Sequence, residues 1–223
     1  MSQSPQSLTA VSQDYLKVIW SAQEWSDAPV TTKALAARLG VGASTVSETV
    51  RRLADAGLVT HEPYGAVGLT PEGRAHALAM VRRHRLLETL LVAHLGYAWD
   101  EVHDEAEVLE HAVSDTFVER IAAHLGHPTR DPHGDPIPGP DGSMDVPAAR
   151  TLWDVEPGEW RVVRISDADP ELLRYLAARG LGLDARVSVT RHSVAGVVSA
   201  RVGDQEQVDL GEVAASAIWV GSP

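Results

Sequence analysis

The chain has 223 residues, no cysteine and a formal net charge of -12 at pH 7. This length accommodates two or three small domains. The absence of cysteine excludes disulfides, zinc–cysteine fingers and thiol catalysis. Since no charged-then-apolar leader and no apolar run of about 18 residues is present, we expect a cytoplasmic protein with no membrane partner.

The acidic charge is unevenly distributed along the chain. Residues 1–90 hold nine Lys and Arg against eight Asp and Glu, residues 91–150 hold three against twelve, and residues 151–223 hold seven against eleven. The nearly neutral first part is compatible with a module that faces DNA. The carboxylate-rich part that follows is a region where bound cations would relieve repulsion.

The first 57 residues predict three helices. Residues 8–25 have apolar side chains at helical spacing, with Asp14 beside them. A short helix, TKALAARL, follows a cap at Thr31 or Thr32 and ends at Gly40. The segment GVGASTVSETVRRLADAG then predicts a third helix with Val46, Val50 and Leu53 facing inward. Helix, glycine-bearing turn and helix form the helix-turn-helix pattern.

The segment LVTHEPYGAVGLT predicts a hairpin, because two short extended runs flank a Pro-Tyr-Gly turn. A hairpin in this position is the wing of a winged helix, whereas the alternative is a helical hairpin followed by an unrelated turn in an enzyme. The hydroxyl-rich, basic outer face of the third helix favours DNA binding. The candidate DNA contacts are Thr32, Lys33, Ser44, Thr45, Ser47, Glu48, Arg51 and Arg52.

The remainder predicts two further domains. Residues 72–125 indicate three helices with a break around Gly96, and residues 127–149, with six prolines and three glycines, indicate a loop or linker. Beyond it, WRVVRI, RVSVTRH, VVSARV and AIWV indicate short strands around one helix, DPELLRYLAARG, as in a small SH3-type barrel. The predicted fold is therefore mainly α with small β, in domains 1–73, 74–140 and 141–223.

Histidine and carboxylate side chains are concentrated in HDEAEVLEH, residues 103–111. At about 100° per residue, four of them share one sector of a helix about 100° wide. A further pair lies at i, i+4 on the preceding segment. A solvated face is the ordinary interpretation, but these charges adjoin apolar stripes and need partners. Imidazole and carboxylate without thiol favour a divalent transition metal. The residues are His103, Glu107, Glu110 and His111, with His84 and Glu88 as the pair.

Five segments in this order resemble the diphtheria toxin repressor family of metal-dependent transcriptional regulators. They are DYLKVIW (14–20), STVSETVRRLADAGLV (44–59), GLTPEGR (68–74), RRHRLLE (82–88) and HDEAEVLEHAVSD (103–115). The carboxy-terminal barrel resembles the SH3-like, FeoA-like domain of that family. The resemblance implies a winged helix-turn-helix, a helical metal-binding and dimerisation domain, and the barrel.

The resemblance also implies about two metal ions per subunit. The sensing site would use Asp14, Glu107, Glu110 and His111, and the second site His84, Glu88 and His103. Asp14 and Glu107 stand where the iron-responsive branch has methionine and cysteine. Because oxygen replaces sulfur there, Mn²⁺ is favoured over Fe²⁺, Co²⁺ or other divalent metals.

Four further residues refine this picture. Some manganese-sensing relatives have an acidic ligand where this chain has Lys17, so a close two-metal cluster is not expected. The barrel domain can lend a ligand to the second site, and the candidates are Asp169 and then Glu171, with helix capping as the alternative role. Glu48 stands where the iron branch has glutamine, so the operator is expected to differ.

The implied function is a homodimeric, manganese-dependent repressor that binds palindromic operator DNA and controls metal homeostasis. An iron-dependent repressor of the same family and a metal-independent winged-helix regulator are the alternatives within DNA binding. A di-metal carboxylate enzyme is the alternative outside it, although the glycine breaks leave the helices short for such a site.

Overall fold

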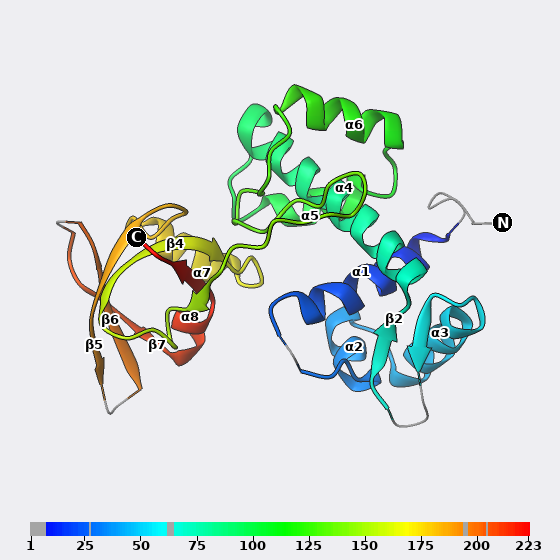
Figure 1. Cartoon of the computed structure of the whole chain (residues 1–223), viewed down its shortest axis with the longest axis horizontal. Helices are drawn as coiled ribbons and strands as arrows, with labels where there is room; N and C mark the ends of the chain where they lie inside the picture. Colours follow the sequence, from blue (N-terminus) through cyan, green and yellow to red (C-terminus); the bar gives the residue numbers. More distant parts are fainter. Residues whose placement is uncertain (1–7, 27, 62–64, 194–195, 204) are drawn as a thin grey trace. The chain divides into compact units, whose positions relative to one another are not determined.

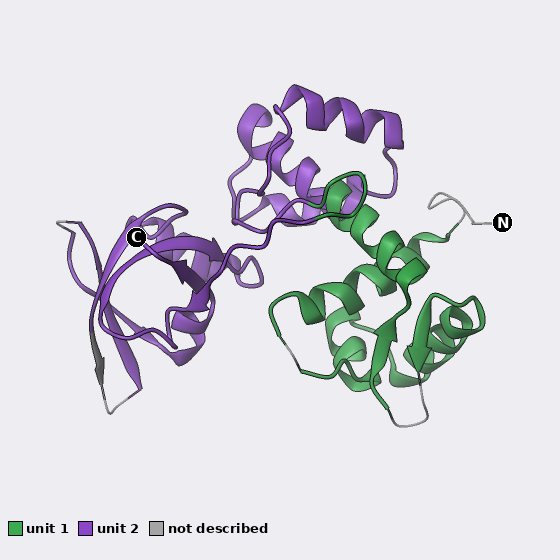
Figure 2. Cartoon of the chain, viewed as in Figure 1, with its two compact units in different colours: residues 1–83, 138–143 green, residues 84–137, 144–223 purple. Residues whose placement is uncertain are grey.

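The structure is a computed structural model that describes residues 8–26, 28–61, 65–193, 196–203 and 205–223. It divides into two compact units, which are described separately (Figure 2). The first comprises residues 1–83 and 138–143, and the second comprises residues 84–137 and 144–223. In the described residues, no helix has the length and apolar character needed to cross a membrane.

Before α4, the described part of the first unit forms three helices and a two-stranded antiparallel hairpin (Figure 1). The elements are α1 (Ala10–Glu24), α2 (Thr32–Leu39), α3 (Ala43–Asp55), β1 (Val59–His61) and β2 (Val67–Leu69). The Thr31 hydroxyl accepts a hydrogen bond from the Ala34 amide, and Gly40 ends α2 in the left-handed conformation at φ 64°. The predicted winged helix-turn-helix is thus confirmed, while Pro63 and Tyr64 of the predicted turn lie outside the described residues.

Helix α4 (Pro71–Leu95) begins directly against the hairpin. The Thr70 hydroxyl donates to the Gly57 carbonyl at 2.8 Å and accepts from the Gly73 amide at 3.0 Å. A Cβ atom at Gly73 would lie 1.8 Å from the Leu58 carbonyl oxygen. Only glycine therefore allows this close approach of helix and strand.

The helical part of the second unit consists of the end of α4, α5 (Val102–Leu109) and α6 (Asp115–His124). These match the three predicted helices, and Gly96 follows α4 at φ 77°. Leu86, Leu87, Val118 and Ile121 belong to the buried cluster between them. The packing directs one face of α4 toward α5, which is where the predicted metal ligands lie.

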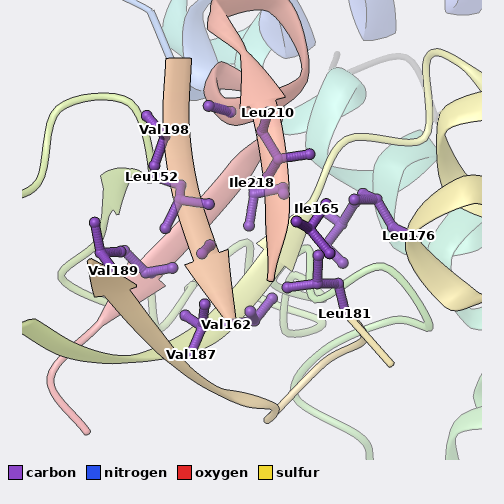
Figure 3. Close-up of a cluster of buried hydrophobic side chains, with 14 of the residues drawn as sticks. Leu152, Val162, Ile165, Leu176, Leu181, Val187, Val189, Val198, Leu210 and Ile218 are labelled. Atoms are coloured by element: carbon purple, nitrogen blue, oxygen red, sulfur yellow. The ribbon is translucent and has the colours of Figure 1, made fainter. Parts of the chain in front are cut away.

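The rest of the second unit is a curved antiparallel sheet with strand order β3-β8-β4-β5-β6-β7. Its elements are β3 (Arg150–Thr151), β4 (Gly158–Ile165), α7 (Pro170–Ala177), β5 (Arg186–Ser193), β6 (Val197–Val202), β7 (Val208–Gly211), α8 (Glu212–Ser216) and β8 (Ile218–Gly221). Alternating aliphatic side chains fill its core (Figure 3). The sequence pattern missed β3, β7 and α8, because two to five residues are too few to show a period.

The proline-rich segment 127–149 contains no helix. Its one β pairing in the described residues is an isolated bridge between Arg130 and Pro136. Its lack of regular structure agrees with the prediction of a loop. However, Asp131, His133 and Asp135 within it are buried. The part of the segment around these three residues is thus packed into the second unit, which composition alone does not indicate.

Gly73→Ala should destabilise the first unit by about 1–3 kcal/mol, because the new methyl group overlaps the Leu58 carbonyl. Gly42→Ala is the matched control, since the nearest atom to its added methyl group lies 3.8 Å away. Urea unfolding followed by circular dichroism measures both. Equal midpoints for the two variants would contradict the close packing.

Candidate metal centre

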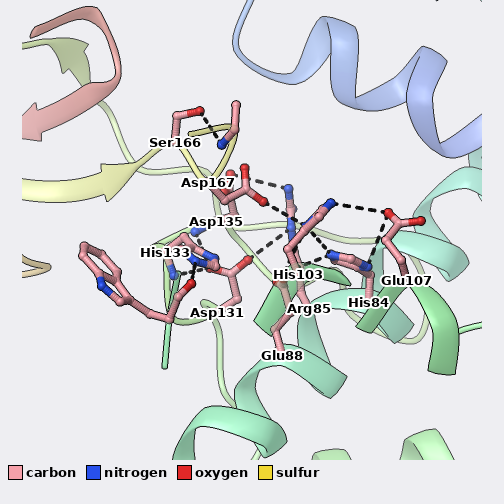
Figure 4. A network of polar contacts seen from close by, with 12 residues as sticks. His84, Arg85, Glu88, His103, Glu107, Asp131, His133, Asp135, Ser166 and Asp167 are labelled. Carbon is pink, nitrogen blue, oxygen red and sulfur yellow. Dashed lines mark hydrogen bonds and ion pairs between the residues drawn. The ribbon is translucent and has the colours of Figure 1, made fainter. Parts of the chain in front are cut away.

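Three predicted ligands meet between α4 and α5 in the second unit (Figure 4). His84 and Glu88 lie one turn apart on α4, with His84 Nε2 and Glu88 Oε1 3.0 Å apart. His103, from the first turn of α5, places its Nδ1 3.2 Å from His84 Nε2 and 3.4 Å from Glu88 Oε1. The three side chains thus offer ligand atoms within 4.8 Å of one another.

Glu88 is the deepest of these groups. Its side chain is 1% exposed, while that of His103 is 45% exposed. A buried carboxylate is stable only when a positive group or several donors face it. Burial raises the pKa of Glu88, but His84 and His103 outweigh this effect and hold the pKa well below its usual range. Glu88 therefore stays anionic at neutral pH.

Asp167 completes the acidic side of the cluster from the barrel. It follows β4 directly, and its Oδ2 lies 3.3 Å from His103 Nδ1. Burial opposes ionisation, yet the hydrogen bond from His103 prevails and lowers the pKa of Asp167 to about 2. The barrel thus contributes a second carboxylate to the same histidine.

The two barrel residues predicted from the sequence lie elsewhere. Asp169 is the N-cap of α7, where its Oδ1 accepts from the amides of Glu171 at 2.9 Å and Leu172 at 3.1 Å. Glu171 is exposed in the first turn of that helix. Helix capping was therefore the correct interpretation of Asp169. Pro170 at the first helical position is the sequence signal for this cap.

His133, from the buried loop, was also missed. One of its ring nitrogens lies within 4.8 Å of ligand atoms of Glu88 and Asp167. Its Nε2 is 2.6 Å from the Trp99 carbonyl, and the two rings are stacked with centroids 6.0 Å apart. Since only a protonated Nε2 can donate to that carbonyl, the neutral ring carries its lone pair on Nδ1. No local sequence pattern indicates this contact.

Whether these residues suit a metal ion can be judged from the buried Nδ1 atom of His133. Within the described residues this atom has no hydrogen-bond partner. A buried acceptor without a donor is unfavourable by about 1–3 kcal/mol. A ligand histidine has this arrangement, with one nitrogen hydrogen-bonded to a carbonyl and the other available to the ion. The donor set of imidazoles and carboxylates therefore fits a divalent cation.

The second predicted set begins on the other side of His84. His84 Nδ1 is 2.6 Å from Glu110 Oε2, and Glu107 Oε1 lies 4.0 Å from the same nitrogen. His111 follows, with its Nε2 3.6 Å from Glu110 Oε1. Three of the four predicted sensing residues thus gather at the end of α5. Asp14, the fourth, lies half-buried on α1 in the first unit, and its part in the site stays a prediction.

His103 has a raised pKa in this cluster. Hydrogen bonds to Asp167 and Glu88 raise the pKa of His103 to about 10, although burial opposes the change. At neutral pH in the absence of metal, His103 is therefore a cation between two carboxylates. Its proton supplies the positive charge that these carboxylates require.

The predicted DNA contacts lie on α2 and α3. Lys33 on α2 is exposed, whereas Thr32 is half-buried. On α3 the buried residues Val46, Val50 and Leu53 face the core and leave a polar outer face. That face presents Ser44, Thr45, Ser47, Glu48, Arg51 and Arg52, all exposed. Their roles toward DNA stay predictions.

Comparisons with known proteins support the same interpretation for all three parts. Family models match residues 7–67 (iron-dependent repressor, N-terminal DNA-binding domain), 70–139 (iron-dependent repressor, metal-binding and dimerisation domain) and 150–221 (FeoA domain). The chain is 34% identical over 219 residues to the iron-dependent repressor IdeR of Mycobacterium leprae, covering 92% of this chain and 94% of that protein.

Solved structures extend the similarity to the whole fold. A structure described as a manganese-dependent transcriptional repressor in complex with manganese is 61% identical, with a TM-score of 0.91 and coverage of 95% of this chain and 100% of that one. The structure of ScaR with bound Cd²⁺ is 32% identical, with a TM-score of 0.83 and coverage of 95% and 99%.

A winged helix-turn-helix followed by a helical histidine–carboxylate centre defines a metal-responsive DNA-binding regulator. The chain belongs to the diphtheria toxin repressor family and is a metal-dependent transcriptional repressor. The predicted family and fold class are confirmed.

Raising the pH should destabilise the metal-free protein. Because the folded pKa of His103 is about 10 and the unfolded value is 6.5, its contribution is complete below pH 6.5 and is lost as the pH rises through 10. The melting temperature in chelator should fall between pH 7 and 10, and His103→Gln should reduce this fall. His124→Gln, at an exposed position, is the control. Parallel curves for His103→Gln and the parent would contradict the assignment.

Proposed function

We propose that this repressor is activated by Mn²⁺ and binds palindromic operator DNA as a homodimer to control metal homeostasis. The observation that carries the metal assignment is the donor set. The histidine and carboxylate clusters contain oxygen and imidazole nitrogen, and the sequence has no cysteine. Oxygen-rich sites suit Mn²⁺, whereas thiolate and thioether donors favour softer ions. The 61% identical structure is described in complex with manganese, which supports the same choice.

The sensing site would consist of Asp14, Glu107, Glu110 and His111. Asp14 belongs to the first helix of the DNA-binding module, while the other three belong to the end of α5. An ion held by both would fix the orientation of α3 relative to the dimerisation helices. Because operator DNA would favour the same orientation, metal and DNA should each raise the affinity for the other.

The second site would consist of His84, Glu88 and His103, joined by His133 and Asp167. A bound divalent cation supplies fixed positive charge to the two carboxylates there. For this, His103 must lose the proton that it shares with Glu88 and Asp167. His84 lies between the two sets, since its ring contacts both Glu88 and Glu110.

The DNA interface would be α3 in each subunit. Ser44, Thr45 and Ser47 reach phosphates and base edges, and Arg51 and Arg52 neutralise backbone charge. Lys33 and Thr32 would contact the backbone from α2. Glu48 can only accept hydrogen bonds, so it suits cytosine N4 rather than adenine. Two such helices about one helical turn apart require a palindromic operator.

The dimer interface would involve α5 and α6. Val108 is 70% exposed and Phe117 is 47% exposed in the single chain. Large apolar side chains at such exposure are typical of a surface that a partner covers. The family model that matches this region is described as a dimerisation domain.

Replacing the carboxylates of Asp14 and Glu107 with sulfur-containing side chains tests the metal assignment. Operator binding by the parent should respond to buffered Mn²⁺. Asp14→Met with Glu107→Cys should raise the Mn²⁺ concentration for half-maximal binding at least about tenfold, or about 1.4 kcal/mol, and improve the response to Fe²⁺. Fluorescence anisotropy with labelled operator measures both. An unchanged Mn²⁺ response would refute the proposed sensing site.

For the second site, the neighbouring residue Asp169 provides a matched control for Asp167. Asp167→Asn should weaken Mn²⁺ binding at this site at least about tenfold, because one carboxylate of the cluster is lost. Asp169→Asn removes a carboxylate two residues away but keeps a capping side chain, so Mn²⁺ binding should remain as in the parent. Electron paramagnetic resonance of free Mn²⁺ during titration separates the two outcomes. The reverse ranking would restore Asp169 as the ligand.

A further inference from the structure

The loop of residues 130–137, here called the docking loop, is part of the connection between α6 and the sheet and is unusually polar for its depth. Asp131, His133 and Asp135 are each at most 5% exposed. Burying two aspartates in eight residues is unfavourable unless fixed positive groups face them. The contacts of these residues therefore show what the loop does in the fold.

One partner is Arg85, which neighbours the metal-centre residue His84 on α4. The Arg85 guanidinium donates to the Pro136 carbonyl at 2.6 Å. Its Nε lies 3.6 Å from Asp131 Oδ2, and its Nη2 lies 3.4 Å from Asp135 Oδ1. The docking loop is thus attached to α4 through one buried arginine.

The opposite partner is Arg164 on β4, three residues before Asp167. Its Nε donates to Asp135 Oδ1 at 2.6 Å, and its guanidinium lies 4.1 Å from the centre of the Trp219 ring. In addition, the amide of Ile165 donates to the carbonyl of His133 at 2.9 Å. Asp135 therefore contacts an arginine from the helices and an arginine from the barrel.

The backbone of the docking loop also lies against β4. Gly134 has φ 91°, and a Cβ atom there would lie 2.1 Å from the Val163 carbonyl oxygen. Within the loop, Asp131 Oδ1 accepts from the amides of His133 at 2.8 Å and Asp135 at 2.9 Å. These hydrogen bonds and the close backbone contact hold the shape of the loop against the strand.

Arginines from α4 and β4 face the carboxylates of the docking loop, although burial and repulsion from Asp135 raise the pKa of Asp131 well above its usual range. Arg85 and Arg164 face Asp131 and Asp135, and all four are buried. The metal centre differs, since there the carboxylates of Glu88 and Asp167 share the proton of His103. Joining the barrel to the helices thus depends on hydrogen bonds and ion pairs between protein groups, centred on Asp135 and Pro136.

We propose that the docking loop holds the barrel against α4 in the absence of metal, so that His133 and Asp167 stand in the metal centre before an ion arrives. Asp135, Arg164 and Gly134 are positioning residues in this arrangement. Ligands already held in place bind an ion more tightly than ligands that must first be ordered. The consequence for Mn²⁺ affinity rests on the proposed function, whereas metal-free docking does not.

The experiment measures docking directly in the full chain treated with chelator. Because the chain has no cysteine, Thr116→Cys on α6 and Ala177→Cys on α7 accept spin labels at two exposed positions without background. Double electron–electron resonance then reports the distance between helices and barrel. We expect one narrow distance distribution in metal-free protein, unchanged by Mn²⁺. A broad metal-free distribution that narrows only with Mn²⁺ would overturn the proposal.

Two matched pairs of variants test the cause of docking. Gly134→Ala should broaden the distribution, whereas Gly126→Ala should not, because Gly126 also has positive φ, at 74°, but no atom within 4 Å of an added Cβ. Asp135→Asn should also broaden it. Its control, Asp154→Asn, removes an exposed carboxylate whose Oδ2 accepts a hydrogen bond from the Thr151 hydroxyl at 2.5 Å, away from the docking loop.

Each outcome of these measurements supports or refutes the proposed role of the docking loop. Broadening by Gly134→Ala and Asp135→Asn alone supports the proposal, and the same variants should weaken Mn²⁺ binding at the second site about tenfold or more. If Gly134→Ala fails to fold, Asp135→Asn decides by the same readout. Narrow distributions in every foldable variant would refute the positioning role. Loss of Mn²⁺ response with metal-free docking intact would instead refute the proposed function.

Discussion

The burial of Glu88 is the constraint on which the centre of this molecule depends. The carboxylate lies on a helix whose neighbouring residues Leu86, Leu87 and Leu91 form the core between α4, α5 and α6. It must therefore be neutralised from within the protein. His84 and His103 do so in the metal-free chain, and their charges keep the pKa of Glu88 low. A divalent cation can take over this role, since it supplies the same charge to the same oxygens.

His84 makes the two predicted metal sites neighbours. Its Nε2 faces Glu88 and its Nδ1 faces Glu110. An imidazole has one proton to donate when neutral and two when charged, so its contacts on the two sides depend on each other. Whatever changes the protonation of this ring on one side also changes the hydrogen bond offered on the other. The two predicted sets of residues therefore form one continuous chain of contacts through His84.

The proline-rich segment shows how composition can mislead about burial. Prolines and glycines prevent helix and strand formation, and residues 127–149 indeed have almost no regular structure. They do not prevent packing, because Asp131 satisfies the amides of His133 and Asp135 while arginines from α4 and β4 face the aspartates. An irregular segment with its own side-chain hydrogen bonds can thus form part of a core.

The sequence by itself determined the elements and the faces of single helices. Helical periodicity placed His84 with Glu88 and grouped His103, Glu107, Glu110 and His111, because residues three and four apart share one side of a helix. Only the tertiary structure decided which distant groups join them. His133 and Asp167 carry no periodic pattern, and their proximity to Glu88 arises from the packing of a loop and a strand end. A local rule accounts for Asp169, which is the N-cap of α7, whereas no short segment of sequence encodes the long-range contacts of Asp167 and His133.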